Sequence, residues 1–297
     1  MNRNSAEARP GQSDEVTLDS APTDVVLAVV IVNFRTPQLV IDCLETLVPE
    51  LVDSEVTIGA VVVENGSGDD SGKHLAREIA KRGWASSVQL LIAEQNTGFA
   101  GGNNLGIRSV SAENYLLLNS DTLVRPGAIR SLLEALHTQP DAGLVGPRLE
   151  WPDGAPQLSA FRFHSPMSEV IRGARTSLVT RLLRGFDVPL PLRDERSIPD
   201  WVSFACVLIR EEVFAEVGLL DEGFFMYFED TEFCSRASRG RWRVLQEPAA
   251  RVVHLRGGSG SVKADLNARR PPPAYYYHSR SRYFRKRYGH FGAFLAN

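Results

Sequence analysis

Short aliphatic runs alternate with longer segments along the first half of the chain. The runs are "VVLAVVIV" at 25–32, "VTIGAVVV" at 56–63, "VQLLI" at 88–92 and "YLLL" at 115–118. Segments of helical length follow at about 37–51, 71–82, 102–110 and 126–137. Apolar runs without alternation are typical of strands buried on both faces of a parallel sheet. The pattern predicts right-handed strand–helix–strand units, and therefore an α/β sheet through about residue 140.

The overall composition is that of a globular protein. The 297 residues suffice for one large domain or two small ones, and a net charge of −3 does not indicate a nucleic-acid-binding protein. Cys43, Cys206 and Cys234 lie far apart and form no CxxC pair. This spacing favours a reduced, cytoplasmic setting over a disulfide framework.

The chain carries no recognisable membrane or export signal. No apolar run approaches the ~20 residues of a membrane span. Residues 1–24 are polar, with scattered charges and prolines, and lack the apolar core of a signal peptide. We expect this segment to be a disordered leader and the protein to stay in the cytoplasm.

Polar residues follow each of the four predicted strands. They are Asn33; Glu64, Asn65 and Ser67; Asn96, two residues before Gly98; Asn119 and Asp121. In a parallel α/β sheet, ligands bind beyond the carboxyl ends of the strands. Ordinary turn composition would explain one such loop, but four loops at one edge favour a binding site.

The stretch "GFAGGNNLG" at 98–106 is rich in glycine. It matches neither the dinucleotide-binding fingerprint nor the P-loop. Its glycines would allow the backbone to approach a ligand or a neighbouring strand closely.

Five motifs together resemble the inverting GT-A glycosyltransferases of family 2, and most closely their rhamnosyltransferase-like branch. The motifs are "VVIVNF", "VVVENGS", "NTGFAGGNNLGI", "YLLLNSDT" and "FFMYFEDTEFCSRASRGRW". The resemblance spans about residues 25–290 and implies a mixed, mainly parallel Rossmann-like sheet flanked by helices. It divides the chain into a nucleotide-sugar-binding half (25–140), an acceptor-binding and catalytic half (141–260) and a C-terminal helical extension (261–297).

The resemblance also implies a metal site for Mg²⁺ or Mn²⁺, which would stabilise the departing diphosphate. Asn119-Ser120-Asp121 stands where the family has its Asp-x-Asp motif, so Asp121 would be a metal ligand and His254 would complete the site. Asn119 replaces the first aspartate, and we expect weaker metal binding because an amide is a poorer ligand. The alternatives are a helix N-terminal acid ahead of Pro126 for Asp121 and a packed polar residue for His254.

The nucleotide pocket implied by the resemblance is formed by the strand-end residues. Asn33, Glu64 and Asn65 would hold the nucleotide, and Ser67, Asn96 and Gly98 would lie near the base and the sugar. Asn119 would donate a hydrogen bond to the ribose or the sugar. Most of the family has an aspartate at the position of Glu64.

The acidic stretch "EDTE" at 229–232 supplies the general base in this interpretation. Acids in the first turn predict a helix that begins near Glu229, and by resemblance Asp230 takes the acceptor proton while Glu229 orients the acceptor or the loop. Glu232 is expected to pair with Arg236 one turn later. The alternative is that all three acids are surface residues, against which the preceding apolar run "FFMYF" argues.

Three further segments complete the predictions. Trp201 is either a platform for a sugar or lipid or a core residue. Residues 164–200 have little periodicity and are predicted to be mobile. The extension carries eight basic residues against Asp265 alone, with tyrosine and phenylalanine interleaved: Lys263, Arg269, Arg270, Arg280, Arg282, Arg285, Lys286 and Arg287. It would either contact an anionic membrane or phosphate or dock on the protein through its aromatic residues.

The function implied is transfer of a sugar, with L-rhamnose from dTDP-rhamnose preferred, to a glycan or polyprenyl-linked acceptor at the inner membrane face. One alternative is a UDP-hexose or galactofuranose donor on the same fold. Another, from a different class, is a non-catalytic module that binds a sugar nucleotide or a membrane.

Overall fold

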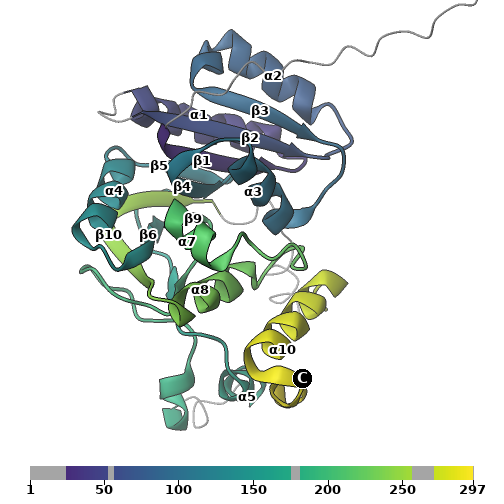
Figure 1. The fold of residues 1–297 in the computed structure, drawn as a ribbon, viewed down its shortest axis with the longest axis vertical. Coiled ribbons are helices and arrows are strands. Elements are labelled where there is room, and N and C mark those ends of the chain that lie inside the picture. The colour runs from purple at the N-terminus through teal and green to yellow at the C-terminus, as the bar shows by residue number, and fades with distance from the viewer. Residues whose placement is uncertain (1–24, 53–56, 175–180, 256–270, 297) are drawn as a thin grey trace, which may run out of the picture.

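The computed structural model describes residues 25–52, 57–174, 181–255 and 271–296. An eight-stranded sheet runs through the molecule in the order β3-β2-β1-β4-β9-β6-β10-β5 (Figure 1). Its first four strands are parallel and follow the predicted runs: β1 (Val25–Asn33), β2 (Ile58–Asn65), β3 (Val88–Ala93) and β4 (Ala112–Asn119). The prediction of a parallel α/β half is therefore confirmed.

The second half makes the sheet mixed. β9 (Cys206–Arg210) runs antiparallel between β4 and β6 (Ala142–Glu150). β10 (Arg243–His254) is parallel to β6 and antiparallel to the edge strand β5 (Thr122–Val124). A separate two-stranded sheet consists of β7 (Ala160–Phe161) and β8 (Trp201–Val202).

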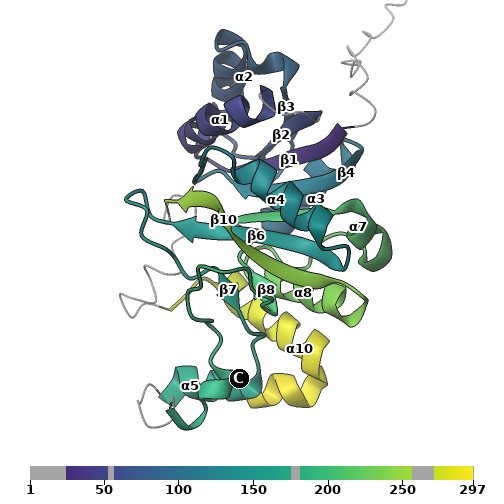
Figure 2. The ribbon, with the colours of Figure 1, turned by 90° about the vertical axis from the view of Figure 1, so that its left-hand side faces the viewer.

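Helices cover both faces of the large sheet (Figures 1 and 2). α1 (Pro37–Val52), α2 (Ser71–Lys81) and α4 (Ala128–Thr138) contribute to one apolar core, whereas α3 (Gly98–Arg108), α7 (Glu211–Val217) and α8 (Glu229–Arg239) contribute to the other. Along β1, Leu27 and Val29 enter the first core and Ala28 and Val30 the second. Burial on both faces explains why the strands read as unbroken apolar runs.

The glycines of 98–106 bring a helix close to the sheet. α3 begins at Gly98, four residues before the predicted start. A Cβ on Gly102 would lie only 2.8 Å from Cγ1 of Val32, and one on Gly106 would collide with Val30. Of the two uses foreseen for these glycines, the close approach to a neighbouring strand is the one observed.

The stretch 201–210 forms two strands. β8 ends at Val202 and β9 begins at Cys206, and the residues between them turn so that the carbonyl of Ala205 accepts a hydrogen bond from the N–H of Asn119 at 2.9 Å. This turn separates the two sheets at the end of β4. The chain after β7 contains α5 (Pro166–Ala174) and a short 3-10 helix, Arg184–Phe186, within the stretch predicted to be mobile.

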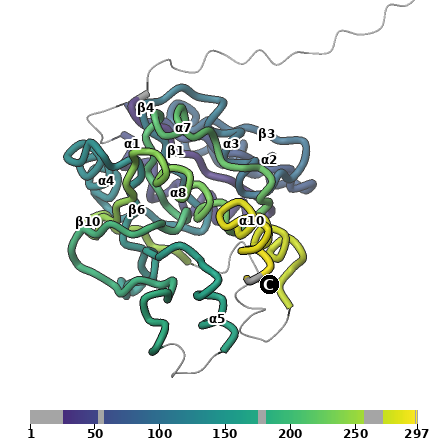
Figure 3. The backbone as a smooth tube through the Cα atoms, turned by 60° about the horizontal axis from the view of Figure 1, so that its bottom comes forward, coloured from purple at the N-terminus to yellow at the C-terminus, as the bar shows by residue number. Residues whose placement is uncertain are grey.

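The C-terminal extension folds into α10 (Ala274–Ala296), which lies beside α8 and α5 in all three views (Figures 1–3). Tyr283 and Phe284 of α10 are fully buried in a third apolar cluster with Phe224 and Phe228. A second 3-10 helix, Trp84–Ser86, precedes β3. The predicted leader, Lys263, Arg269 and Arg270 lie outside the described residues.

Candidate active site

The parallel strands bring the predicted loops to one edge of the sheet. In the register of the sheet Asn33 lies opposite Glu64, and Asn119 lies opposite Val32. Asn33 is fully buried; its Oδ1 faces the N–H and hydroxyl of Thr36 at 3.3 and 3.4 Å, and its Nδ2 has no hydrogen-bond partner among the described residues. A buried amide donor without a partner is costly, so this position suits a ligand acceptor.

The loop after β2 is stabilised by its own side chains. Glu64 Oε1 accepts the N–H of Ser67 at 2.9 Å. The Ser67 hydroxyl oxygen accepts the N–H of Arg35, and the Arg35 guanidinium donates to the Ser67 carbonyl, both at 2.9 Å. Arg35 has a positive φ of 59°, which a non-glycine residue adopts at a cost of about 1–3 kcal/mol. Glu64 and Ser67 therefore shape the edge by joining the β1 and β2 loops.

Asn65 connects the β2 and β3 loops. Its Nδ2 donates to Asn96 Oδ1 at 3.1 Å and to the Gly98 carbonyl at 2.9 Å. Its Oδ1 accepts the N–H and hydroxyl of Thr97 at 3.2 and 3.0 Å. The amide thereby uses all four of its hydrogen-bonding positions. The structure gives Asn65 a structural role at the site.

Gly98 lets the β3 loop lie against the "FFMYF" segment. Its φ is +73°, and a Cβ there would collide with the carbonyl oxygen of Phe225. The next residue, Phe99, donates its N–H to the same carbonyl at 2.7 Å. Both a positive φ and a close backbone contact require glycine at this position.

Asp121 and His254 lie together at the other side of the site. Asp121 precedes β5 and His254 ends β10, and these strands pair so that His254 lies opposite Thr122. His254 Nε2 is 3.5 Å from Asp121 Oδ1. Because α4 begins only at Ala128, the alternative role of Asp121 as a helix N-terminal acid does not apply.

The atoms of this pair suit a cation. Asp121 is 2 % exposed, and its Oδ1 and the Nδ1 of His254 are buried without hydrogen-bond partners among the described residues. A carboxylate and an imidazole are acceptable ligands of divalent metals. The described residues contain no group of three or more His, Cys, Asp or Glu that could hold a metal, so a bound ion would need ligands from the substrate as well. Asn119, next to this pair, is partly exposed.

α8 places Glu229 and Asp230 in its first turn, as predicted. Burial raises the pKa of Asp230 to about 6, although Oδ1 accepts hydrogen bonds from the N–H and the hydroxyl of Thr231 at 2.7 and 3.2 Å. Burial, and then the charge of Asp230, raise the pKa of Glu229 well above its ordinary value. Glu229 Oε2 has no hydrogen-bond partner among the described residues. Two adjacent acids with raised pKa values are typical of catalytic sites.

Tyr227, which sequence reasoning passed over as one residue of an apolar run, lies two residues before Glu229 and stacks on Tyr275 with ring centroids 6.3 Å apart. Burial raises its pKa to about 12, and Tyr275, Glu229, Tyr276 and Asp121, in that order, add to the shift. Tyr227 and Phe228 have positive φ angles of 69° and 68° immediately before α8. Consecutive strained residues cluster at functional sites. The aromatic sequence "FFMYF" gave no indication of these positive φ angles.

Two other predicted side chains have structural contacts. Glu232 pairs with Arg236 through both carboxylate oxygens, at 3.0 and 3.1 Å, as expected. Trp201 is 8 % exposed, stacks on Phe161 with ring centroids 4.2 Å apart, and donates its indole N–H to the Arg162 carbonyl. The core alternative therefore describes Trp201 better than the platform.

A mixed, mainly parallel sheet with helices on both faces is the GT-A fold, and two solved glycosyltransferases share it. GalNAc-T7, solved with UDP, GalNAc and Mn²⁺, superposes with a TM-score of 0.58 at 16% identity over 77% of this chain and 43% of its own. The mannosyltransferase PcManGT of Pyrobaculum calidifontis, solved with GDP-Man and Mn²⁺, gives a TM-score of 0.54 at 13% identity over 94% and 75%. Both likenesses concern the fold.

The family is shown by sequence. Residues 22–271 match the family model described as glycosyltransferase like family 2. The chain belongs to this family and is a glycosyltransferase.

Two curated relatives have names that state the kind of sugar they transfer. An N-acetylglucosaminyl-diphospho-decaprenol L-rhamnosyltransferase of Mycobacterium tuberculosis is 27% identical over 222 residues, 69% of either chain. The low-salt glycan biosynthesis hexosyltransferase Agl10 of Haloferax volcanii is 29% identical over 201 residues, which cover 65% of this chain and 58% of the relative.

Proposed function

We propose that this chain is an inverting, metal-assisted transferase that moves L-rhamnose from dTDP-rhamnose to a hydroxyl of a polyprenyl-diphosphate-linked glycan. The observation that carries the proposal is the contact of Gly98 and Phe99 with the Phe225 carbonyl, which holds the segment before Glu229 and Asp230 against the polar edge of the sheet. One cleft would thus hold a site for the diphosphate and a base for the acceptor. The activity named for the mycobacterial relative supports this choice of sugar and acceptor.

Asp121 and His254 would hold Mg²⁺ or Mn²⁺. Oδ1 of Asp121 is buried without a hydrogen-bond partner among the described residues and faces Nε2 of His254 at 3.5 Å, and only two protein ligands leave room for phosphate oxygens and water. When bound, the ion supplies charge stabilisation for the departing nucleoside diphosphate.

Asp230 would be the general base. It accepts the proton of the acceptor hydroxyl as that oxygen bonds to the anomeric carbon, and the bond from that carbon to the diphosphate breaks. Thr231 holds Oδ1, which leaves Oδ2 to receive the proton. A pKa near 6 gives a base that is ionised at neutral pH yet still basic enough to help.

The remaining edge residues would shape the donor pocket. Asn33 and Asn119 have amide groups suited to ligand contact, and the uncommitted Oε2 of Glu64 is suited to a base N–H or ribose hydroxyl. Asn65, Asn96 and Gly98 would act by holding the β3 loop in place. Glu229, whose pKa is raised by burial and by the charge of Asp230, would orient the loop or the acceptor.

A hexose donor is the second candidate, because the haloarchaeal relative is named a hexosyltransferase. With a lipid-linked acceptor, the enzyme would work at the cytoplasmic face of the membrane that contains this acceptor. In the described residues, no helix has the length and apolar character needed to cross a membrane. The proposal includes a peripheral contact with this membrane.

The test is release of nucleotide from a panel of dTDP- and UDP-sugars, with and without a short-chain, water-soluble polyprenyl-diphosphate N-acetylglucosamine. Each reaction is run with Mn²⁺, with Mg²⁺ and with EDTA. We expect acceptor-dependent release of dTDP from dTDP-rhamnose with metal, and loss of release in Asp121→Ala. Asp194→Asn is the matched control, since that carboxylate is 96% exposed. Turnover of UDP-hexose alone would favour the second candidate, and binding without any turnover would favour a non-catalytic module.

A further inference from the structure

The most exposed large apolar side chains of the described residues gather at one end of the molecule. Leu182, Phe294 and Phe291 are 84%, 77% and 73% exposed. Leu182 follows α5, and the two phenylalanines belong to the last turns of α10. Figures 1 and 2 show α5 and the C-terminal end of α10 side by side, away from the large sheet.

α5 and the last turns of α10, beyond Gly289, each expose apolar side chains. On α5, Met167 and Val170 are 39% and 44% exposed, whereas Ser168 is buried. At Gly289 a φ of 71° interrupts α10, and the turn beyond it exposes Phe291 and Phe294 while burying Ala296. Helices of soluble proteins normally place apolar residues three apart against the core. We call Met167, Val170, Leu182, Phe291 and Phe294 the apolar end.

Buried charge fixes these two helical segments relative to each other. The Arg280 guanidinium on α10 pairs with Glu169 on α5 at 2.6 Å, and it also donates to the carbonyl of Ala296. Arg280 and Glu169 are both less than a tenth exposed at the side chain. A buried pair of this kind is costly to break, so the two segments are held in a defined arrangement.

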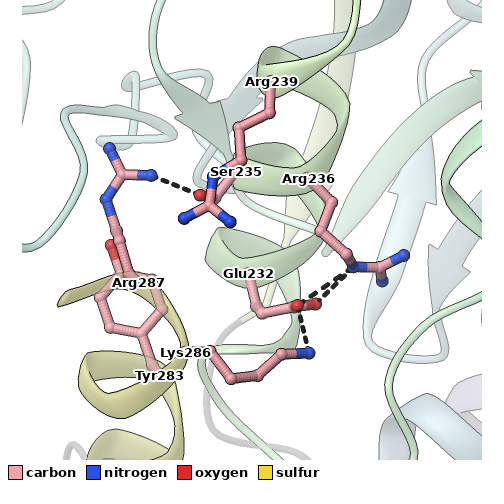
Figure 4. Close-up of a pocket in the computed structure, with 7 residues that line it drawn as sticks. All are labelled: Glu232, Ser235, Arg236, Arg239, Tyr283, Lys286 and Arg287. Atoms are coloured by element: carbon pink, nitrogen blue, oxygen red, sulfur yellow. Dashed lines mark hydrogen bonds and ion pairs between the residues drawn. The ribbon is translucent and has the colours of Figure 1, made fainter. Parts of the chain in front are cut away.

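The middle of α10 directs its basic side chains at the protein. Figure 4 shows Lys286 and Arg236 both on Glu232, and Arg287 on the hydroxyl of Ser235. Arg282 and Lys286 also pair with Asp221, at 2.8 and 2.7 Å. The extension therefore docks through ion pairs as well as aromatic residues, and these cations are already engaged.

Other cations surround the apolar end. Arg181 and Arg184 flank Leu182 on the chain, and Arg285 lies one turn before the Gly289 break; all three are exposed. No ion pair of theirs with a carboxylate is formed within the described residues. Glu169, the acid of α5, is neutralised by Arg172 as well as Arg280. The result is an apolar surface with exposed arginines near it in the chain.

We infer that the apolar end docks on a lipid bilayer that carries anionic headgroups. Exposed apolar side chains insert at the boundary of headgroups and acyl chains, and basic residues at their border add electrostatic attraction to anionic lipids. A second copy of the chain fits less well, because a two-fold contact would bring the same arginines face to face. The functional reason for membrane docking rests on the proposed lipid-linked acceptor, whereas the surface itself is described without it.

The direct test is flotation of the full chain with vesicles of phosphatidylcholine alone and of an equal mixture with phosphatidylglycerol. We expect the native chain to bind the anionic vesicles and Phe291→Ser/Phe294→Ser to lose at least about tenfold in affinity. Arg181→Gln/Arg184→Gln should lose less, and the loss should resemble the one that added salt causes in the native chain. Leu182→Ser provides a second variant outside α10. Ile92→Ser is the control, because Ile92 is 62% exposed on β3.

Three results would overturn the inference. They are no binding of the native chain to anionic vesicles, equal binding of the double variant, and a self-association that is lost in the same variant. Turnover separates this inference from the proposed function. Phe291→Ser/Phe294→Ser should keep full turnover on the short-chain acceptor and lose it on a long-chain acceptor in vesicles. If the chain bound vesicles but showed no turnover on any acceptor, the membrane-docking surface would be supported and the proposed function would be refuted.

Discussion

His254 Nε2 lies 3.5 Å from Asp121 Oδ1, although the two residues come from opposite halves of the chain. The antiparallel pairing of β5 with β10 produces this contact, since His254 lies opposite Thr122 in the register. A sheet that continues past the parallel half thus completes the site that the parallel strands begin. The proposed metal chemistry depends on this one pairing.

Removal of either member of the pair should uncouple nucleotide binding from metal. In Asp121→Asn and His254→Gln we expect the affinity for dTDP with Mn²⁺ to fall by about tenfold or more, with no change in EDTA. Calorimetry measures the affinity for dTDP with Mn²⁺ and in EDTA. Asp194→Asn should behave as the native chain, and equal metal-supported affinity in all four proteins would refute the assignment.

Gly98→Ala should damage the site through the backbone. The new Cβ would collide with the Phe225 carbonyl, so we expect a loss of about 2–4 kcal/mol in the free energy of unfolding and a loss of activity. Gly83→Ala is the matched control, because Gly83 has a similar φ of +70° but open space around its Cβ position. It should cost only about 1 kcal/mol. Chemical denaturation would compare them, and equal losses would mean that the contact with Phe225 does not matter.

Turnover should fall in acid because Asp230 must be ionised to accept a proton. With its pKa raised to about 6, the ionised fraction rises with pH up to about 6 and then levels off. We expect kcat/KM to drop about tenfold per pH unit below 6 and to be flat above it. Thr231→Val removes a hydrogen bond that lowers this pKa, so its profile should move to higher pH. Superimposable profiles would contradict the role of Asp230.

Glu229→Gln should stabilise the fold at high pH. Burial raises the pKa of Glu229, so between its ordinary and its folded-state pKa the folded chain holds a proton that the unfolded chain has released, and folding at pH 8 is penalised. The penalty is absent below the ordinary glutamate pKa of 4.5 and grows as the pH rises through the folded-state pKa. We expect the Tm of Glu229→Gln to exceed the native Tm by about 2–4 °C at pH 8 and to match it near pH 4. A gain that is independent of pH would point to packing instead.

Much of the fold could be predicted from local pattern. The unbroken apolar runs indicate β1 to β4 because strands buried on both faces need such residues, and the placement of Asn33 and Glu64 at one edge follows from the parallel arrangement. The start of α3 was missed because Gly98 has the composition of a loop. Its helical role depends on the contact with Phe225, far away in the chain.

The site was less accessible to sequence reasoning where a role depends on distant partners. Asn65 has the composition of a ligand-binding residue, yet its amide is used by Asn96, Thr97 and Gly98 of the next loop. The backbone strain at Tyr227 and Phe228 has no signature in residue type. The inward direction of Lys286 could not be predicted either, because Asp221 and Glu232 lie more than fifty residues earlier.

The most direct test of the account is single turnover by Asp230→Asn with donor, metal and the short-chain acceptor. The substitution preserves shape and removes the base, so the rate of sugar transfer should fall by about 10²–10⁴ while the donor affinity stays within about twofold of the native value. Asp194→Asn should transfer at the native rate. Transfer by Asp230→Asn at a rate near that of the native chain would contradict the assignment of the base, and with it the mechanism proposed for this protein.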